Sequence, residues 1–205
     1  MKKGSKVFAI IFSVLLVAGI LGMFIYLNNK PKSQTLDAEV VISNVDNVVL
    51  RNLEINYPPT PKEVLKYYSE ITTCFYQADL KEEDLVKLAQ TARKLYDEEL
   101  CAGISEEEYL ESLREDILEF NSMGIVVSGY TVSSSTDVEE FEMDGRKYAR
   151  LYATYRLRQG TEYIYSNEVF VMRKDEEGHW KILGWELLEE DEVEELQSEQ
   201  MAEDA

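Results

Sequence analysis

Residues 144–173, DGRKYARLYATYRLRQGTEYIYSNEVFVMR, decide the fold of this chain. They open with Asp144-Gly145, a dipeptide typical of the tight turn in a β-hairpin, and Gln159-Gly160 interrupts them further on. Between and after these breaks, tyrosine, valine and leucine alternate with polar residues, as they do in strands that bury one face. The stretch therefore predicts two long antiparallel strands, Lys147–Leu157 and Glu162–Arg173.

The same period of two extends to both sides of this stretch. Ile125–Ser133 is rich in β-branched residues, Val138–Met143 precedes the Asp144 turn, and Trp180–Leu188 follows a polar turn. Consecutive strands joined by short turns usually pair as antiparallel neighbours. We therefore expect a curved antiparallel sheet of roughly four to six strands.

Helical spacing replaces this alternation in the preceding part of the chain. One helix begins at the capping box Thr60–Glu63, with proline at its first position. A second is predicted over Lys81–Leu100. A third begins at another capping box, Ser105–Glu108, and stops at Gly124. Three helices followed by consecutive hairpins predict an α+β domain with the helices packed on one face of the sheet.

Val7–Leu27, VFAIIFSVLLVAGILGMFIYL, is an unbroken run without a charged residue. As a helix it rises about 31 Å, which matches a bilayer hydrocarbon core of about 30 Å. A cleaved secretory signal is the alternative, but the residues that follow offer no small-x-small cleavage site. We therefore interpret the run as an uncleaved transmembrane anchor. Lysines at positions 2, 3 and 6 favour a cytoplasmic N-terminus and an extracytoplasmic domain at the cell membrane.

These patterns divide the chain into five segments. They are a basic cytoplasmic stub (1–6), the transmembrane anchor (7–27), a tether with a lead-in segment (28–55), the α+β domain (56–188) and an acidic tail (189–205). Within the lead-in, Val41, Val45 and Val48 fall at helical spacing, which favours a helix at the start of the domain. The tail is nearly all acid, a composition typical of segments without a packed core.

Charge limits the partners that the domain can bind. The formal net charge is −19, and five lysines precede the first acid, Asp37, so the remainder is more negative still. Binding to nucleic acid or to anionic headgroups requires cationic side chains opposite phosphate. We therefore exclude nucleic acid and expect neutral, cationic or protein partners, with a protein or envelope component favoured.

Two stretches resemble known families. Three helices followed by strands that end in Gly178–Trp185, GHWKILGW, resemble the nuclear transport factor 2-like fold, a cystatin-like cone shared with ketosteroid isomerase and polyketide-cyclase relatives. Asn56–Val64, NYPPTPKEV, behind an anchor is similar to an uncharacterised family of membrane-anchored proteins from Gram-positive anaerobes. The first resemblance implies a cone of helices and curved sheet. Neither implies an activity, because this fold hosts enzymes, binding modules and scaffolds.

Glu168 is the candidate functional residue. It interrupts an apolar strand and shares strand parity with Phe170 and Met172. If that face lines the cone, burial raises the pKa of the Glu168 carboxyl, as a proton-shuttling enzyme requires. The alternative is an exposed or salt-bridged glutamate, with Arg150 or Arg156 on the neighbouring strand as its partner.

The other reactive residue types suggest no catalytic or metal site. Cys74 and Cys101 lie on consecutive predicted helices, where either a disulfide or two buried thiols is possible. His179 lies in a polar turn, so we expect a surface residue. One histidine and two distant cysteines form neither a zinc site nor a catalytic triad, and we expect no cofactor. The many tyrosines either line a pocket or fill the core.

Three functional hypotheses follow. The favoured one is a membrane-tethered, non-enzymatic interaction module that binds a protein or envelope component. The first alternative is a small-molecule binder, or a ketosteroid-isomerase-like enzyme, that uses the cone interior and Glu168. The second is a structural component of an envelope assembly. An open pocket around Glu168 favours the small-molecule hypothesis, and a filled cone excludes it.

The anchor makes a direct prediction about fractionation. The full chain should stay in the membrane pellet in about 1 M salt, which screens surface charges within about 3 Å but leaves a buried apolar helix in place. Ultracentrifugation and N-terminal sequencing measure this. Release by salt alone, or a mature chain that starts beyond residue 27, would contradict the interpretation.

Overall fold

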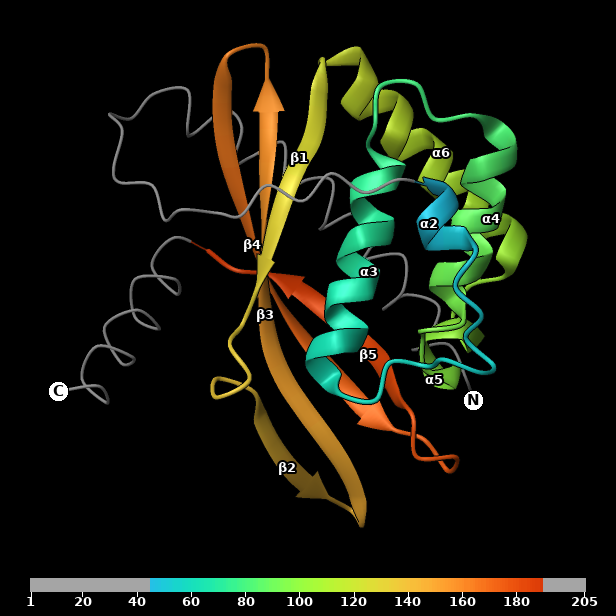
Figure 1. Cartoon of the computed structure of the whole chain (residues 1–205), viewed down its shortest axis with the longest axis vertical. Coiled ribbons are helices and arrows are strands. Elements are labelled where there is room, and N and C mark those ends of the chain that lie inside the picture. The colour runs from blue at the N-terminus through green and yellow to red at the C-terminus, as the bar shows by residue number, and fades with distance from the viewer. Residues whose placement is uncertain (1–44, 190–205) are drawn as a thin grey trace, which may run out of the picture.

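The computed structural model describes residues 45–189, which form five helices and a five-stranded antiparallel sheet. The helices gather on one side of the sheet, and α3 lies next to it (Figure 1). The helices are α2 (Val45–Val49), α3 (Pro61–Phe75), α4 (Glu82–Arg93), α5 (Glu98–Ala102) and α6 (Glu106–Ser122). The strands are β1 (Ile125–Val132), β2 (Glu139–Met143), β3 (Arg146–Gln159), β4 (Glu162–Lys174) and β5 (Trp180–Leu187). The predicted α+β class is confirmed.

The predicted anchor lies outside the described residues. Between Val45 and Glu189, the structure has no helix that combines the length and apolarity needed to cross a bilayer. The expected anchor Val7–Leu27, the tether that follows it and nearly all of the acidic tail fall outside this range. The membrane assignment therefore stays a prediction from the sequence.

Side-chain caps start the two long helices where the sequence predicted. Thr60 Oγ1 accepts a hydrogen bond from the Glu63 amide at 3.2 Å, with Pro61 at the first helical position of α3. At α6, Ser105 and Glu108 form both bonds of a capping box, at 3.2 Å and 3.0 Å. These bonds satisfy amides that a helix leaves unpaired at its N-terminus. Both predicted starts are confirmed.

The predicted helix Lys81–Leu100 is wrong in its second half. Helix α4 ends at Arg93, and the chain then runs along the edge of β5. The Ile182 amide donates to the Leu95 carbonyl, and the Asp97 amide donates to the Ile182 carbonyl, both at 2.8 Å. A sheet edge offers unpaired backbone groups, and pairing with them replaces the helical bonds of these residues. The chain then turns into the short helix α5.

The lead-in segment is helical over a shorter range than predicted. We expected a helix near the start of the domain between residues 38 and 55, and within the described part only Val45–Val49 forms one. Beyond it, the chain turns at Leu50 and continues without regular structure to α3. The buried Tyr67 hydroxyl donates to the Val48 carbonyl at 2.7 Å, which attaches α2 to α3. Tertiary contact therefore fixes this segment.

Strand β3 organises the sheet. The order is β1-β3-β4-β5, and β2 also pairs with β3. Residues 146–150 of β3 pair with β2, and residues 153–159 pair with β1, so β1 and β2 lie end to end along one edge of β3. Strand β2 is exposed throughout and extends beyond the helices (Figure 1). The helices thus cover only the part of the sheet that contains β1, β5 and the adjacent halves of β3 and β4.

Two bulges change which residues face the helices. On β1 the register shifts between Val127 and Gly129. On β5 it shifts at Leu183, which has no partner on β4 between the pairs Val171–Gly184 and Met172–Ile182. A bulge bends its strand and increases the local twist. Odd-numbered residues such as Val127 are buried before the β1 bulge, and the even-numbered Tyr130 is buried after it. On β5, the buried residue before the bulge is Ile182, and the half-buried residue after it is Trp185. Both edges of the helix-covered sheet therefore curve around the interior.

A buried ion pair joins the break between α4 and α5 to the sheet. The Arg173 guanidinium from β4 binds both oxygens of the Asp97 carboxylate, and its Nη1 also donates to Glu99 at 3.1 Å. The Arg173 and Asp97 side chains are 12% and 6% exposed. Asp97 also caps α5 by accepting from the Glu99 amide at 2.9 Å. The Asp97 carboxylate thus fixes α5 against β4, and the Asp97 backbone amide bonds to β5.

Removal of the arginine should be costly. Arg173→Leu leaves the Asp97 carboxylate buried without its cation, and we expect a loss of about 3–5 kcal/mol in the unfolding free energy. Arg150→Leu is the matched control, because its partner Glu139 lies at 3.2 Å in an exposed pair whose loss costs about 0–1 kcal/mol. Urea unfolding of the full chain in lipid nanodiscs measures both. Equal effects would contradict the role of Arg173.

Candidate functional site

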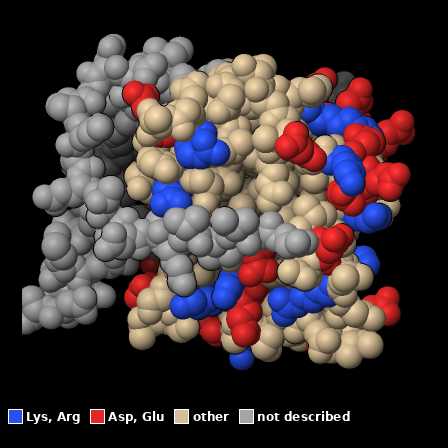
Figure 2. Space-filling model, turned by 45° about the horizontal axis from the view of Figure 1, so that its top comes forward, with Lys and Arg blue, Asp and Glu red and all other residues tan. Residues whose placement is uncertain are grey.

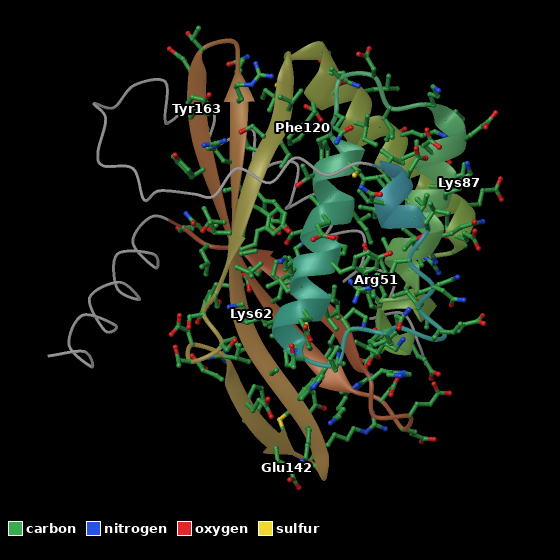
Figure 3. All side chains as sticks on the ribbon, in the orientation of Figure 1. Arg51, Lys62, Lys87, Phe120, Glu142 and Tyr163 are labelled. Carbon is green, nitrogen blue, oxygen red and sulfur yellow. The ribbon has the colours of Figure 1, made fainter. Side chains whose placement is uncertain are left out.

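A cavity of about 490 Å³ lies between the helices and the concave face of the sheet. Helices α3, α5 and α6 form one wall, and β1, β3, β4 and β5 form the other. Its volume lies within the usual range for small-molecule sites, about 300–1,000 Å³. The aromatic lining residues are Tyr68, Phe75, Tyr76, Tyr96, Tyr109, Phe120, Tyr155 and Trp185. Figure 3 shows Phe120 between α6 and the sheet, whereas Tyr163 lies on the side away from the helices.

Glu168 lies in this pocket, as its strand parity predicted. On β4 it alternates with Ser166, Phe170 and Met172 on the inner face, and the last two are fully buried. Its partner across the ladder on β3 is the buried Ala153, which has no polar side chain to offer the carboxyl group. Alternation along the strand therefore forces this glutamate toward the interior.

Burial raises the pKa of the Glu168 carboxyl to about 8. Desolvation is the main cause, and the nearby Ser166 hydroxyl partly offsets it, although the two groups do not meet in hydrogen-bond geometry. Glu168 is half-buried, because protein surrounds most of its side chain and the rest of it faces the pocket. At pH 7 the carboxyl group is therefore mainly protonated and can donate a hydrogen bond.

The salt-bridge alternative for Glu168 is wrong. Arg150 and Arg156 occupy even positions of β3, which face away from the helices. Arg150 pairs with Glu139, and the Arg156 Nε donates to Ser128 Oγ at 3.1 Å. The residue opposite Glu168 is an alanine, so the neighbouring strand offers it no cation.

Asp116 is a second carboxyl group in the pocket, and sequence reasoning missed it. It lies on α6, and burial raises its pKa to about 6, with further contributions from Glu119 and Glu115. At pH 7 it is mainly ionised. A signal existed, because Asp116 is three residues after the buried Leu113 and four before the buried Phe120. That spacing places it on the core-facing side of the helix.

Hydrogen bonds between tyrosines fix one wall of the pocket. The Tyr96 hydroxyl shares hydrogen bonds with Tyr68 at 3.2 Å and with Tyr109 at 3.1 Å. The rings of Tyr68 and Tyr96 each lie 5.8 Å from Trp185. Burial raises the pKa of all three phenols, and that of Tyr109 reaches about 12, so they stay protonated. The wall is therefore a preorganised surface of rings.

Ser166 is an unsatisfied polar group in the same pocket. Its side chain is buried, with 5% of the residue exposed, and its hydroxyl has no hydrogen-bond partner in the described structure. Such a group costs about 1–3 kcal/mol unless a ligand or water satisfies it. Ser166 precedes Glu168 by two residues on the inner face of β4. Together they form a polar site on an otherwise largely apolar surface.

The two cysteines are both thiols in the structure, with no disulfide between them. Cys74 is buried in the core on α3. Cys101 lies on α5, and its Sγ is 3.8 Å from the Arg93 carbonyl oxygen at the end of α4. Burial raises the pKa of the Cys101 thiol, which keeps it protonated. The two sulfur atoms belong to different environments, because the break after α4 gives α5 its own packing.

His179 belongs to the turn between β4 and β5. With Asp175 and Glu177 it forms a cluster whose ligand atoms lie within 4.8 Å of one another, the one such group among residues 45–189. The contacts of this turn are structural, since the His179 amide donates to Asp175 Oδ1 at 2.7 Å and the His179 ring stacks on Tyr57, which precedes α3, at 4.3 Å. We therefore interpret the cluster as the structure of a surface turn.

Fold and pocket define a class of protein: an α+β domain with a ligand-sized cavity between its helices and a curved antiparallel sheet. The chain belongs to the family of a domain of unknown function, DUF6715, whose model matches residues 1–185. The matched range includes both Val7–Leu27 and the pocket residues up to Trp185. No curated protein matches the chain.

The raised pKa predicts how stability depends on pH. The folded state holds a proton on Glu168 up to about pH 8, whereas the unfolded state releases it near 4.5. Relative to Glu168→Gln, the unfolding free energy of the wild type should therefore fall between these values, by on the order of 4–5 kcal/mol. Urea unfolding at several pH values, followed by tryptophan fluorescence of the full chain in nanodiscs, measures the difference.

Glu186→Gln is the control for this experiment. Glu186 lies on β5, is exposed and does not line the pocket. Its stability should follow the wild type across the pH range. A difference between wild type and Glu168→Gln that stays constant with pH would contradict the buried titration.

Proposed function

We propose that the domain binds a small, mostly apolar molecule in the pocket around Glu168, and that the hydrophobic segment Val7–Leu27 holds it at the outer face of a membrane. The observation that carries the proposal is the position of Glu168 in a cavity of about 490 Å³. A carboxyl group that only stabilised the fold would have a partner, and this one faces open space between aromatic rings.

Small side chains support the view that the space is built for a ligand. Ala153 lies opposite Glu168 on the inner face of the sheet, and Ser166 on β4 and Ser112 on α6 line the pocket. Larger apolar residues at these positions would fill the interior and add burial to the core. The chain instead keeps polar or small groups where packing alone favours large apolar ones.

The open pocket changes the order of the hypotheses. The sequence favoured an interaction module for a protein or envelope component, and an open cone with Glu168 inside favours the small-molecule alternative. We propose binding rather than a reaction, because the lining offers few acid–base groups: apart from its tyrosines and from Glu99, which is paired with Arg173, these are Glu168 and Asp116. Proton transfer by Glu168, as in a ketosteroid-isomerase-like enzyme, stays a hypothesis, as does a structural role in an envelope assembly.

The fold assignment belongs to the same proposal. Helices against the concave face of a bulged, curved antiparallel sheet are in keeping with a nuclear transport factor 2-like cone. In such a cone the space between helices and sheet is where a ligand would lie. The assignment predicts no activity on its own.

A substitution that fills the pocket tests the proposal. Wild-type chain in nanodiscs should give a saturable change in tryptophan emission with at least one of phenethylamine, phenethyl alcohol and hydrocinnamate, because Trp185 lines the pocket. Ser112→Phe should weaken that binding about tenfold or more, since steric overlap costs roughly 1–3 kcal/mol.

Ser122→Phe is the matched control. It makes the same change on the same helix at an exposed position outside the pocket, and it should bind like the wild type. Empty nanodiscs correct for partition into lipid. No saturable binding of any of the three compounds, or equal loss in both variants, would contradict a ligand pocket.

A further inference from the structure

We propose that the ligand is an organic cation: a protonated amine on an apolar or aromatic body, with its ammonium group against Glu168 and Ser166. The inference rests on the proposed function and specifies its ligand class. The shape of the cavity alone does not select this class. Three independent features of the lining do, namely its charge, its unsatisfied polar groups and its aromatic surfaces.

The lining carries acids and no bases. Asp116 and Glu168 contribute carboxyl groups from α6 and β4, and Glu99 contributes one from α5 that is paired with Arg173. Among the described residues that line the pocket, none is a lysine, arginine or histidine. An anionic ligand would lose its hydration and find no cationic side chain in the lining to compensate, which is unfavourable. Figure 2 shows acidic and basic side chains side by side on the helical side of the molecule, and the whole chain has a net charge of −19.

The polar groups at the inner face of β4 suit a donor. Ser166 Oγ is buried without a hydrogen-bond partner in the described structure, and Glu168 has no cation opposite it, only Ala153. An ammonium group has up to three N–H donors and no acceptor. It can therefore donate to both side chains at once from within the pocket, which Ser166 and Glu168 both line. The tyrosine hydroxyls of the opposite wall bond to one another instead.

The aromatic rings suit the rest of such a ligand. Tyr68, Tyr96 and Trp185 lie with their ring centroids 5.8 Å apart in each pair. Tyr76 and Phe120 lie 4.5 Å apart at another part of the wall. Ring faces attract a nearby cation by about 0.5–2 kcal/mol, most strongly where water is excluded, and they also cover an apolar body. Charge and stacking thus favour the same ligand.

The ligand would replace the proton that neutralises Glu168 in the empty pocket. Tyr68 faces it from α3, Tyr76 from the C-cap of α3 and Tyr155 from β3, and Asp116 lines the pocket from α6. None of these groups is a cation, and β5 contributes only uncharged lining residues. Binding of an ammonium group therefore moves the Glu168 proton to solvent and leaves an ion pair, so charge in the pocket is conserved.

A matched series of head groups tests the inference. Phenethylamine, phenethyl alcohol and hydrocinnamate share one apolar body and differ in being cationic, neutral and anionic. Titration into the full chain in nanodiscs should give tightest binding for the amine and weakest for the carboxylate. Glu168→Gln should weaken amine binding about tenfold or more, with a smaller effect of Ser166→Ala, and change alcohol binding little.

The pH profile separates an ion pair from simple shape complementarity. Amine affinity should rise by up to about tenfold per pH unit toward pH 8, where Glu168 ionises, and calorimetry in two buffers should detect proton release. Glu168→Gln should abolish both effects. Glu186→Gln, on the same sheet outside the pocket, should retain them.

Two results would overturn the inference and leave the pocket intact. One is tighter binding of the alcohol than of the amine, with an alcohol affinity that decreases above pH 8. This result would mean that protonated Glu168 donates to a neutral ligand. The other is an amine affinity that is equal in wild type and Glu168→Gln while both proteins remain folded. Absence of binding by all three compounds would instead contradict the proposed function itself.

Discussion

Alternation of side chains along β4 is the constraint on which the rest of this structure depends. Phe170 and Met172 are fully buried in the core, so Glu168, on the same face of the strand, must point between the sheet and the helices. Turning it outward would expose both apolar residues, because a shift of one position moves the whole face. The fold accommodates the carboxyl group by holding a proton on it.

The curvature of the sheet and the attachment of α5 to it keep the interior open around that carboxyl group. The bulges of β1 and β5 curve both edges of the sheet, so its inner face surrounds a space rather than a flat layer. Helix α5, which closes part of the rim, is fixed by the Arg173–Asp97 ion pair and by backbone bonds between residues 95–97 and Ile182. The rim therefore depends on contacts outside the pocket, which leaves the lining free to carry polar groups.

The pocket is also where this sequence departs from the rules that stabilise a core. Ser166, Glu168 and Asp116 are polar residues on faces that are otherwise apolar, and each costs stability through desolvation or an unmade hydrogen bond. Such departures are expected at functional sites. The remainder of the core is conventional, with aliphatic and aromatic residues from α3 against β3 and β4. The polar groups thus mark the surface that a ligand would contact.

The sequence by itself determined the α+β class, the starts of α3 and α6, the hairpins of β2 to β5 and the strand face that Glu168 shares with Phe170 and Met172. These depend on caps, turns and alternation, which involve residues close together in the chain. Only the tertiary structure decided that α4 ends at Arg93, that Cys74 and Cys101 stay apart, and that Asp116 shares a pocket with Glu168. It also decided that a cavity lies between the helices and the sheet, because a cavity depends on the summed volumes of side chains from three helices and four strands, which no local pattern contains.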